Sequence, residues 1–320
     1  MAVNQGPVND IWICKSPRCA GQCDDKVDLC QYMIISCDVP DPGASADVVI
    51  TDDAGNTWTN ATANAFAAGE EIVSATCFDK DSTTTRYLVV RGTDADPGEV
   101  AYSDDLGATW TNVDFEAAPD AHFAVDSGAL FAFDYKHIWL VTNGGYIFYS
   151  SDGGVSWTNQ DDGNVTTEDY HAVRFANIND GYATADVGVV VRTIDGGLTW
   201  TACTTITGTP GVNCVYVFDK DNAVVGDDNG DMWRTWDGGT TWTQIYTGSD
   251  SINDIDFAND FVGFALADDT LIRTRNGGED WENVTVPTAT EYNAVVACDE
   301  NNAYIVGEDT SNDGIVVKVG

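Results

Sequence analysis

Cysteines are the residues of this chain whose number and spacing point most directly to chemistry. Five of the nine cysteines lie within the first 37 residues. Four of those five are separated by three, six and six residues, without the paired Cys-x2-Cys arrangement that structural zinc sites usually contain. The spacing therefore favours disulfides that pin a loop over a zinc site. These four residues are Cys19, Cys23, Cys30 and Cys37.

Cys203 and Cys214 form a second candidate pair. They flank a predicted connection between two groups of strands, so the sequence predicts a further disulfide there. Cys14, Cys77 and Cys298 lie on predicted innermost strands and are expected to be small, buried core residues. Because disulfides form in oxidising compartments, this interpretation favours a protein that meets an oxidising medium.

The arginines supply no recognisable active site. Arg192, Arg234 and Arg273 each directly precede the threonine of a repeated motif, so they are interpreted as repeat features rather than as a converging triad. The chain also has no Gly-x-Ser-x-Gly elbow, no phosphate-binding loop and no dinucleotide fingerprint. The sequence therefore predicts that the protein is not an enzyme and has no cofactor.

Residue types that bind metal ions lack the spacing of a metal site. The three histidines, His122, His137 and His171, have neither His-x-His nor His-x3-His spacing, so structural or exposed roles are expected. The segment Asp227–Asp231 alternates oxygen-bearing side chains as a Ca²⁺ loop does, but no acidic residue follows at the end of such a loop. It is predicted to be an Asp-rich hairpin turn, and no metal site is predicted.

A short motif organises the chain. The pattern Ser/Thr-x-Asp-x-Gly-x-x-Trp occurs six times, and only the last copy replaces Asp with Asn. Its tryptophans are 52, 47, 43, 42 and 39 residues apart, which is the period of a four-stranded propeller blade. The Asp can accept backbone N–H groups of its own turn, the Gly can adopt a positive φ, and the Trp can anchor the hairpin in the core. The structural positions are Asp53, Trp58, Asp105, Trp110, Asp152, Trp157, Asp195, Trp200, Asp237, Trp242, Asn276 and Trp281.

The strands of a repeat follow from alternation of apolar and polar residues and from β-branched and aromatic enrichment. The fourth repeat is the clearest. Its predicted strands are Tyr170–Ala176, Gly181–Asp186, Val189–Thr193 and Trp200–Cys203, so the motif joins the third strand to the fourth.

The motif resembles the Asp-box repeat of the sialidase-like (BNR) β-propellers, and it covers nearly the whole chain. The resemblance implies an all-β fold of four-stranded antiparallel blades that carry Asp-box hairpins. We expect a single propeller domain over residues 1–320, with seven blades or, as the alternative, six. A Cys-rich insertion at about residues 16–31 interrupts blade 1, and an N-terminal strand near Ala2–Gln5 is expected to close the ring.

Glycoside hydrolysis is the activity that sialidase-like relatives suggest. Their site uses an arginine triad, an acid/base aspartate and a Tyr–Glu nucleophile pair. The Arg-Ile-Pro signature of that family has no match in this chain, and 10 Glu residues leave few partners for a tyrosine. A carbohydrate-binding or sialidase-like glycoside hydrolase is therefore kept only as an alternative.

A second resemblance comes from the Asp-Gly-Gly-x-x-Trp form of Asp195–Trp200 and Asp237–Trp242. It is shared with the propellers that assist photosystem II assembly, which bind partners through basic surface patches. This resemblance implies a cellular assembly or scaffolding role. In this chain the 14 Lys and Arg residues are dispersed, which argues against that mode of binding.

The net charge excludes several kinds of partner. The chain has 14 Lys and Arg against 52 Asp and Glu, a formal charge of −38. Such a surface repels phosphate backbones and anionic lipids, and no run of about 18 apolar residues occurs, so neither nucleic-acid binding nor membrane insertion is expected. Asp outnumbers Glu by 42 to 10. Short, strongly hydrated carboxylates in this excess indicate adaptation to high salt.

The N-terminal residues show neither a basic nor an apolar region, so no secretory signal is expected. A chain with disulfides but without an export signal fits a virus structural protein, which is made in the cytoplasm and oxidised after release. The leading hypothesis is therefore a displayed component of a particle that infects a halophile: a head decoration, turret or tail spike, located in the virion or outside the cell. Other particle proteins and a host surface glycan or protein are the expected partners. The alternative is a cytoplasmic assembly or scaffolding propeller.

Two departures from the repeat mark the predicted binding face. They are the Cys-rich loop of blade 1 and the long connection Asn112–Ser127. Insertions into repeat proteins tend to map to a binding face, so both loops are predicted to contact a partner.

Overall fold

A computed structural model describes most of the chain. The described residues are 8–13, 33–37, 47–52, 57–61, 71–93, 96–113, 129–289, 291–308 and 314–320. The predicted Cys-rich insertion, the N-terminal closing strand and most of the connection Asn112–Ser127 lie outside these ranges.

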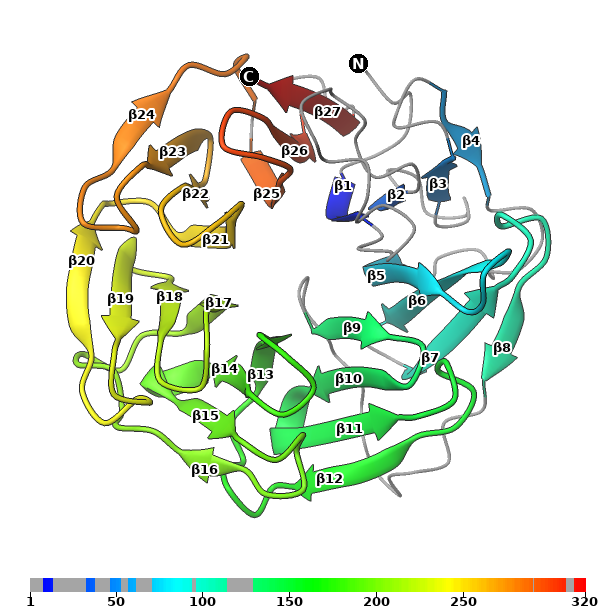
Figure 1. The fold of residues 1–320 in the computed structure, drawn as a ribbon, viewed down its shortest axis with the longest axis horizontal. Helices are drawn as coiled ribbons and strands as arrows, with labels where there is room; N and C mark the ends of the chain where they lie inside the picture. The colour runs from blue at the N-terminus through cyan, green and yellow to red at the C-terminus, as the bar shows by residue number, and fades with distance from the viewer. Residues whose placement is uncertain are drawn as a thin grey trace.

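The strands form antiparallel sheets arranged as blades around a central axis (Figure 1). Blade 1 consists of β1 (Val8–Ile13), β2 (Met33–Cys37), β3 (Asp47–Thr51) and β4 (Thr59–Asn60). Blade 2 consists of β5 (Glu71–Asp79), β6 (Thr85–Thr93), β7 (Asp96–Ser103) and β8 (Thr111–Val113). Blade 3 consists of β9 (Leu130–Asp134), β10 (His137–Thr142), β11 (Tyr146–Ser150) and β12 (Thr158–Asp162).

The second half of the ring repeats this arrangement. Blade 4 consists of β13 (Tyr170–Phe175), β14 (Gly181–Ala185), β15 (Val190–Thr193) and β16 (Thr201–Ala202). Blade 5 consists of β17 (Val212–Val217), β18 (Ala223–Asp227), β19 (Asp231–Thr235) and β20 (Thr243–Thr247). Blade 6 consists of β21 (Ile252–Phe257), β22 (Gly263–Ala267), β23 (Thr270–Thr274) and β24 (Glu282–Val284). The last sheet consists of β25 (Glu291–Ala297), β26 (Ala303–Glu308) and β27 (Gly314–Val319).

The predicted all-β propeller of four-stranded antiparallel blades is confirmed. Six sheets have four strands, as in the six-bladed alternative, and β25–β27 form a three-stranded sheet between blade 6 and blade 1 (Figure 1). In each sheet the first strand lies nearest the axis and the strands follow in sequence order outward. The strands of blade 4 agree with the predicted bounds to within one residue. Within the described ranges, no helix is long and apolar enough to cross a membrane.

The core lies between the blades. Every residue of the second strands β14, β18 and β22 is buried, because the preceding and the following blade each cover one face of these strands. Tyr182, Val225 and Phe264 on these strands are completely buried. The first strands alternate buried and partly buried residues instead, because one of their edges faces the central axis. Burial of this apolar surface is what makes successive blades pack into a ring.

Antiparallel order gives the ring two different faces. We call one the box face: it holds the turns from each first strand to the second and the box loops from each third strand to the fourth. We call the other the connector face: it holds the loops from second to third strands and the connections between blades, with the short 3-10 turns η1 (Asn143–Gly145) and η2 (Asp186–Gly188). Loops of adjacent blades on the same face are therefore neighbours, although about 40 residues separate them in the sequence.

Candidate interaction face

The box loop of blade 4 is closed by its own polar side chains. The Thr193 hydroxyl accepts the backbone N–H of Gly197 at 2.9 Å and donates to Asp195 Oδ1 at 2.8 Å. Asp195 Oδ1 also accepts the backbone N–H of Thr199 at 2.9 Å, and its Oδ2 accepts the Thr199 hydroxyl at 2.7 Å. Gly197 has a φ of +86°, a conformation that favours glycine. The Thr and Asp of the motif thus satisfy the donors of one turn, and the Gly supplies the backbone conformation that the turn needs.

The same bonds recur in the boxes of blades 2, 3 and 5. Asp105, Asp152 and Asp237 each accept a backbone N–H four residues on, at 2.8 Å in every case. Asp53 lies outside the described residues, so the box of blade 1 is represented by the buried Thr51 and the partly buried Trp58.

The box of blade 6 differs from the others by one donor. Asn276 Oδ1 accepts the backbone N–H of Asp280 at 3.0 Å and the hydroxyl of Thr274 at 2.9 Å. Its Nδ2 donates to Asp280 Oδ2 at 3.0 Å. In the other described boxes the residue at the position of Asp280 is Thr or Ser, whose hydroxyl donates to the Asp. In blade 6 the side chain of Asn276 is therefore the donor and that of Asp280 the acceptor, the reverse of the other described boxes, and the turn is still closed by a side-chain hydrogen bond.

These hydrogen bonds hold the box carboxylates in their ionised form. The pKa of Asp105 is lowered, first of all by the Thr109 hydroxyl, and that of Asp237 first of all by the Thr241 backbone N–H. For Asp195, burial raises the pKa, but the bonds from Thr199 outweigh burial and the net shift is downward. A carboxylate with a low pKa and engaged lone pairs is poorly suited to act as a general acid. The geometry therefore favours structural roles for these residues.

The box tryptophans fill the seams between the outer strands. Trp200 is 8 % exposed and meets the ring of Phe175 edge-on, with 5.9 Å between ring centroids. Trp110 Nε1 donates across a seam to the carbonyl of Ala61 at 2.7 Å, which ties blade 2 to blade 1. The other box tryptophans, Trp58, Trp157, Trp242 and Trp281, are partly buried.

The box loops of blades 3 to 6 also accept a bond from the blade before them. The acceptor is the carbonyl of the glycine that follows the box Asp or Asn. Arg86 Nη1 of blade 2 donates to Gly153 at 3.0 Å, and Gln160 Nε2 of blade 3 donates to Gly196 at 3.1 Å. The guanidinium of Arg234 in blade 5 donates to Gly277. The loops thus connect the blades as well as closing their own hairpins.

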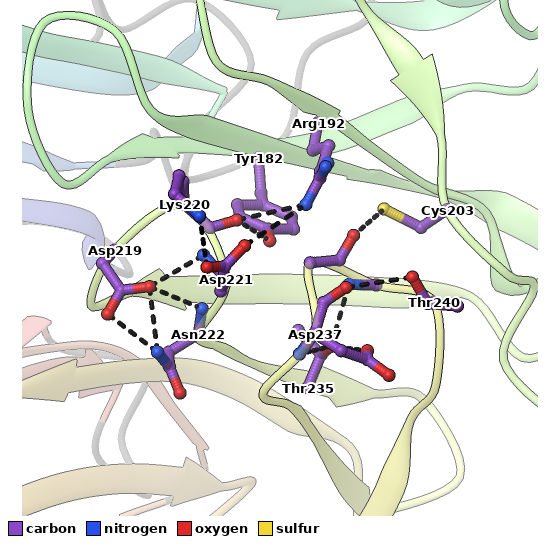
Figure 2. Close-up of polar contacts among 12 residues, drawn as sticks. Tyr182, Arg192, Cys203, Asp219, Lys220, Asp221, Asn222, Thr235, Asp237 and Thr240 are labelled. Carbon is purple, nitrogen blue, oxygen red and sulfur yellow. Dashed lines mark hydrogen bonds and ion pairs between the residues drawn. The ribbon is translucent and has the colours of Figure 1, made fainter.

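Figure 2 shows the seam between blades 4 and 5. The Tyr182 hydroxyl donates to the carbonyl of Lys220 at 2.7 Å, and Arg192 Nη1 approaches the same carbonyl at 3.3 Å. On the outer side of the seam, the Cys203 thiol points at the Gly238 carbonyl, with 3.9 Å between sulfur and oxygen. Asp219 accepts N–H groups of its own turn, including the side-chain amide of Asn222.

The predicted disulfide between Cys203 and Cys214 is wrong, because both cysteines are free. Cys203 follows β16, the outermost strand of blade 4. Cys214 is buried on β17, the innermost strand of blade 5, so one thiol lies at the rim of the ring and the other near its axis. Cys77 is buried as predicted, but it is disulfide-bonded rather than a plain core residue. Cys298 is only partly buried, and its thiol lies 3.8 Å from the carbonyl oxygen of Val296. Cys19, Cys23 and Cys30, and the side chain of Cys37, lie outside the described part.

The predicted repeat positions of the arginines and histidines are separated in space. Arg192, Arg234 and Arg273 occupy equivalent sites on third strands of blades 4, 5 and 6, each at its own seam. His137 Nδ1 lies 2.8 Å from Asp134 and His171 Nε2 lies 3.0 Å from Asp186, while His122 falls outside the described residues. The described arginines and histidines named here lie on different blades or strands and do not form one cluster.

The Asp-rich segment predicted as a hairpin turn connects β18 to β19. Asp227 Oδ1 accepts the backbone N–H groups of Asn229 and Asp231 at 3.0 and 2.9 Å, and its Oδ2 accepts Trp233 Nε1 at 2.8 Å. Its carboxylate is thus occupied within the turn. Among the described residues, no cluster of three or more His, Cys, Asp or Glu side chains could hold a metal ion.

Polar residues of the innermost strands form contacts that the sequence analysis missed. Asn213 Nδ2 donates to the carbonyl of Ile252 in the next blade at 3.3 Å, and Asn253 Nδ2 donates to the carbonyl of Tyr292 at 3.1 Å. Asp254 Oδ2 accepts the backbone N–H of Val295 at 2.9 Å. The signal was present as Asn at the same inner-strand position 40 residues apart.

Burial raises the pKa of Asp254 to about 6, although the charge of Arg174 opposes that shift. The adjacent Asp256 makes an equivalent bond, from the backbone N–H of Ala297 at 2.8 Å. These two carboxylates join blade 6 to the three-stranded sheet beside the axis.

Exposed apolar side chains gather on the box face. Of the nine large apolar residues in the described part that are exposed, seven belong to its turns and loops, Phe133 lies at the end of β9 that leads into one of those turns, and only Val187 lies on the connector face. Leu198 is the most exposed, at 81 %. The others are Leu106, Phe133, Val155, Ile178, Ile194, Trp236 and Phe261. A face with this concentration of apolar side chains is typical of a protein-interaction surface.

Charge is distributed differently on the two faces. The lysines Lys80, Lys136 and Lys220 lie in turns of the box face. None of the described loops of the connector face contains Lys or Arg, whereas they contain acidic residues: Glu168, Asp169, Asp186, Asp228, Asp250, Asp268 and Asp269. On the box face, these lysines offset part of the negative charge of the surrounding carboxylates.

Comparisons with known proteins agree with a propeller of BNR-like repeats. Residues 104–249, less than half of the chain, match the family described as "Photosynthesis system II assembly factor YCF48". No curated protein matches the chain.

Several solved structures share the fold. A structure of "YCF48 bound to D1 peptide" is 13 % identical, with 99 % of this chain and 93 % of that chain covered and a TM-score of 0.68. YCF48 from Cyanidioschyzon merolae is 15 % identical, with coverage of 100 % and 97 % and a TM-score of 0.68. The GH74 xyloglucanase from Xanthomonas campestris is 14 % identical, with coverage of 96 % and 52 % and a TM-score of 0.65. At these identities the likeness shows the fold alone.

Proposed function

We propose that this protein is a non-enzymatic propeller that binds other proteins and assists their assembly. The observation that carries the proposal is the concentration of exposed apolar side chains on the box face. The box carboxylates beneath that face are engaged in their own turns, so they stabilise the surface and leave binding to the apolar and cationic side chains around them.

The comparisons favour the assembly alternative over the virus-particle hypothesis. The matched family is that of an assembly factor, and one protein of similar fold is bound to a peptide. Nothing in the comparisons supports a particle component, although the xyloglucanase shows that the fold also occurs in an enzyme. We propose that residues 1–320 act as one binding domain, in the cytoplasmic location named above as the alternative.

Cross-linking on the full chain in native extract tests this proposal. An amine-reactive reagent reports the box face through Lys136 and Lys220. A carboxyl-reactive reagent reacts on both faces, and it reports the connector face where mass spectrometry assigns the link to residues such as Asp186. We expect the amine-reactive reagent to link the box face to a small set of partner proteins. Leu198→Asp should reduce those cross-links because it places a charge in the apolar face, while Val187→Asp on the connector face serves as the matched control.

A chain that forms no cross-link to any partner with either reagent would contradict the proposal. So would hydrolysis of a xyloglucan or sialoside substrate by the purified chain.

A further inference from the structure

Three arginines at the same repeat position have different partners. Arg192 Nη1 lies 4.0 Å from Asp221 of the next blade, and Arg273 Nη2 lies 2.7 Å from Glu282 of its own blade. Among the described residues, no carboxylate oxygen lies within 4.0 Å of a guanidinium nitrogen of Arg234, so it forms no ion pair with them. A partly buried guanidinium without a counter-ion is unusual in a chain with a net charge of −38.

Blades 5 and 6 differ at the turn position whose carboxylate pairs with Arg192. The carbonyl of Asp221 accepts the backbone N–H of Gly238 at 2.9 Å, and the carbonyl of Phe261 accepts that of Gly277 at 2.8 Å. Asp221 and Phe261 therefore occupy equivalent positions in blades 5 and 6. At this position blade 5 has a carboxylate that pairs with the arginine of the preceding blade, whereas blade 6 has an aromatic residue. The residue before it also changes, from Lys220 to Asp260, whose charge acts on Arg234 without forming an ion pair.

Arg234 is held in place by contacts on three sides. One Nη1–H donates to the carbonyl of Gly277, and Cζ lies 4.6 Å from the ring centroid of Phe218 and 5.1 Å from that of Trp236. Nε is buried without a hydrogen-bond partner. Burial lowers the pKa of Arg234, and the more distant charges of Asp260, Asp219 and Glu279 only partly oppose that shift. The cation is thus fixed and incompletely compensated.

Two exposed aromatic residues lie at this seam: Trp236 beside the cation, and Phe261 in the turn that binds the backbone N–H of Gly277. Trp236 is 52 % exposed and Phe261 is 66 % exposed. The counterpart of Trp236 in blade 4 is Ile194, which also directly follows the box threonine. Trp and Arg are the residue types most enriched among the side chains that dominate protein interfaces. Such a combination at one seam, in place of the ion pair found at the next, points to a binding site.

We propose that Arg234, Trp236 and Phe261 form a patch that binds a protein segment carrying a carboxylate beside apolar side chains. The carboxylate of that segment occupies the position that Asp221 takes toward Arg192, and its apolar side chains cover the two rings. Arg–carboxylate bonds are directional and charge-assisted, so they fix the segment, while the aromatic contacts supply buried area. This inference rests on the proposed function and names the site and partner class for it.

Selection from a phage-displayed random peptide library on the immobilised full chain tests the patch. We expect enriched peptides to carry Asp or Glu next to aromatic or aliphatic residues. Synthetic copies of these peptides should bind in a fluorescence anisotropy titration, and Trp236→Ala should weaken that binding about tenfold or more, as for a central interface residue. Ile194→Ala, the matched change in blade 4, should leave it unchanged.

A second variant separates binding from folding. Phe261→Asp supplies within the chain the carboxylate that blade 5 presents to Arg192. It should pair with Arg234, abolish peptide binding and leave the melting temperature unchanged or raised. Loss of both binding and stability would show that the patch is only a packing seam.

Enrichment of basic peptides, or no enrichment, would overturn the proposed patch. Peptides that bind but respond neither to Trp236→Ala nor to Phe261→Asp would also overturn it, while leaving protein binding by another surface intact. Absence of partner cross-links in native extract is the separate result that contradicts the proposed function itself.

Discussion

Asp195→Ala removes three hydrogen bonds from one box and leaves the rest of the blade in place. Asp195 accepts the Thr199 backbone N–H at 2.9 Å, the Thr199 hydroxyl at 2.7 Å and the Thr193 hydroxyl at 2.8 Å. Water can satisfy the exposed Thr199 groups in the variant, so the loss is smaller than three buried bonds would give. We expect the free energy of unfolding to fall by about 1–3 kcal/mol.

Urea denaturation followed by tryptophan fluorescence measures this loss, with Asp195→Asn as the comparison. The Asn276 box of blade 6 shows that an amide oxygen can accept the backbone N–H of the turn. In blade 4 the Asn amide would meet the Thr199 hydroxyl, which can accept its hydrogen. Asp195→Asn should therefore be less destabilising than Asp195→Ala.

The pH dependence gives an independent check. The pKa of Asp195 is lowered in the folded protein from an ordinary value of 3.8, so its contribution to stability is present above that value and lost as the pH falls below it. The difference between the wild type and Asp195→Ala should therefore narrow in acid. Equal unfolding free energies at pH 7 would refute the structural role of the box carboxylate.

Three further predictions follow from the charges and the backbone. Burial raises the pKa of Asp254 to about 6, so ionisation of this carboxyl weakens the fold as the pH rises through that value. Asp254→Asn should therefore raise the melting temperature at pH 8 relative to the wild type. At pH 4 the same substitution should change the melting temperature less. If the Asp-rich surface is a salt adaptation, the thermal midpoint measured by calorimetry should rise between roughly 0.1 and 3 M KCl, and a flat or falling curve counts against it. Gly239 has a φ of +79°, and a Cβ there would lie 2.3 Å from Cys203 Sγ, so Gly239→Ala should cost about 1–3 kcal/mol in urea denaturation, whereas a change within error would show that the seam can relax.

The repeats could be predicted from the sequence because the box motif of each four-stranded blade lies within eight consecutive residues. A tryptophan at a fixed distance from an acidic turn residue is enough to place Trp157 and Trp200 in successive hairpins, and strand alternation supplies the rest of the blade. The bonds of Asp195 within its own turn also follow from local chemistry, since donor and acceptor lie four residues apart.

The seams could not be predicted in the same way. Whether Arg234 meets a carboxylate depends on which residue of the next blade stands opposite it, and that register is set by packing between sheets rather than by the sequence around Arg234. The same limit explains the wrong disulfide: Cys203 and Cys214 are near in sequence, but the chain crosses from the outside of one blade to the inside of the next between them. Sequence distance carries little information across a blade boundary.

The glycine carbonyls that accept bonds across the seams have a consequence for how such a ring can evolve. The donor differs from seam to seam: a guanidinium from Arg86, an amide from Gln160, a thiol from Cys203. If a blade were duplicated or deleted, a box loop would face a different preceding blade. The donor side chain of that blade would not match the glycine carbonyl of the loop. The seams therefore make the blades of this chain non-interchangeable, and a blade grafted elsewhere in the ring should need the donor of its original predecessor to be transplanted with it.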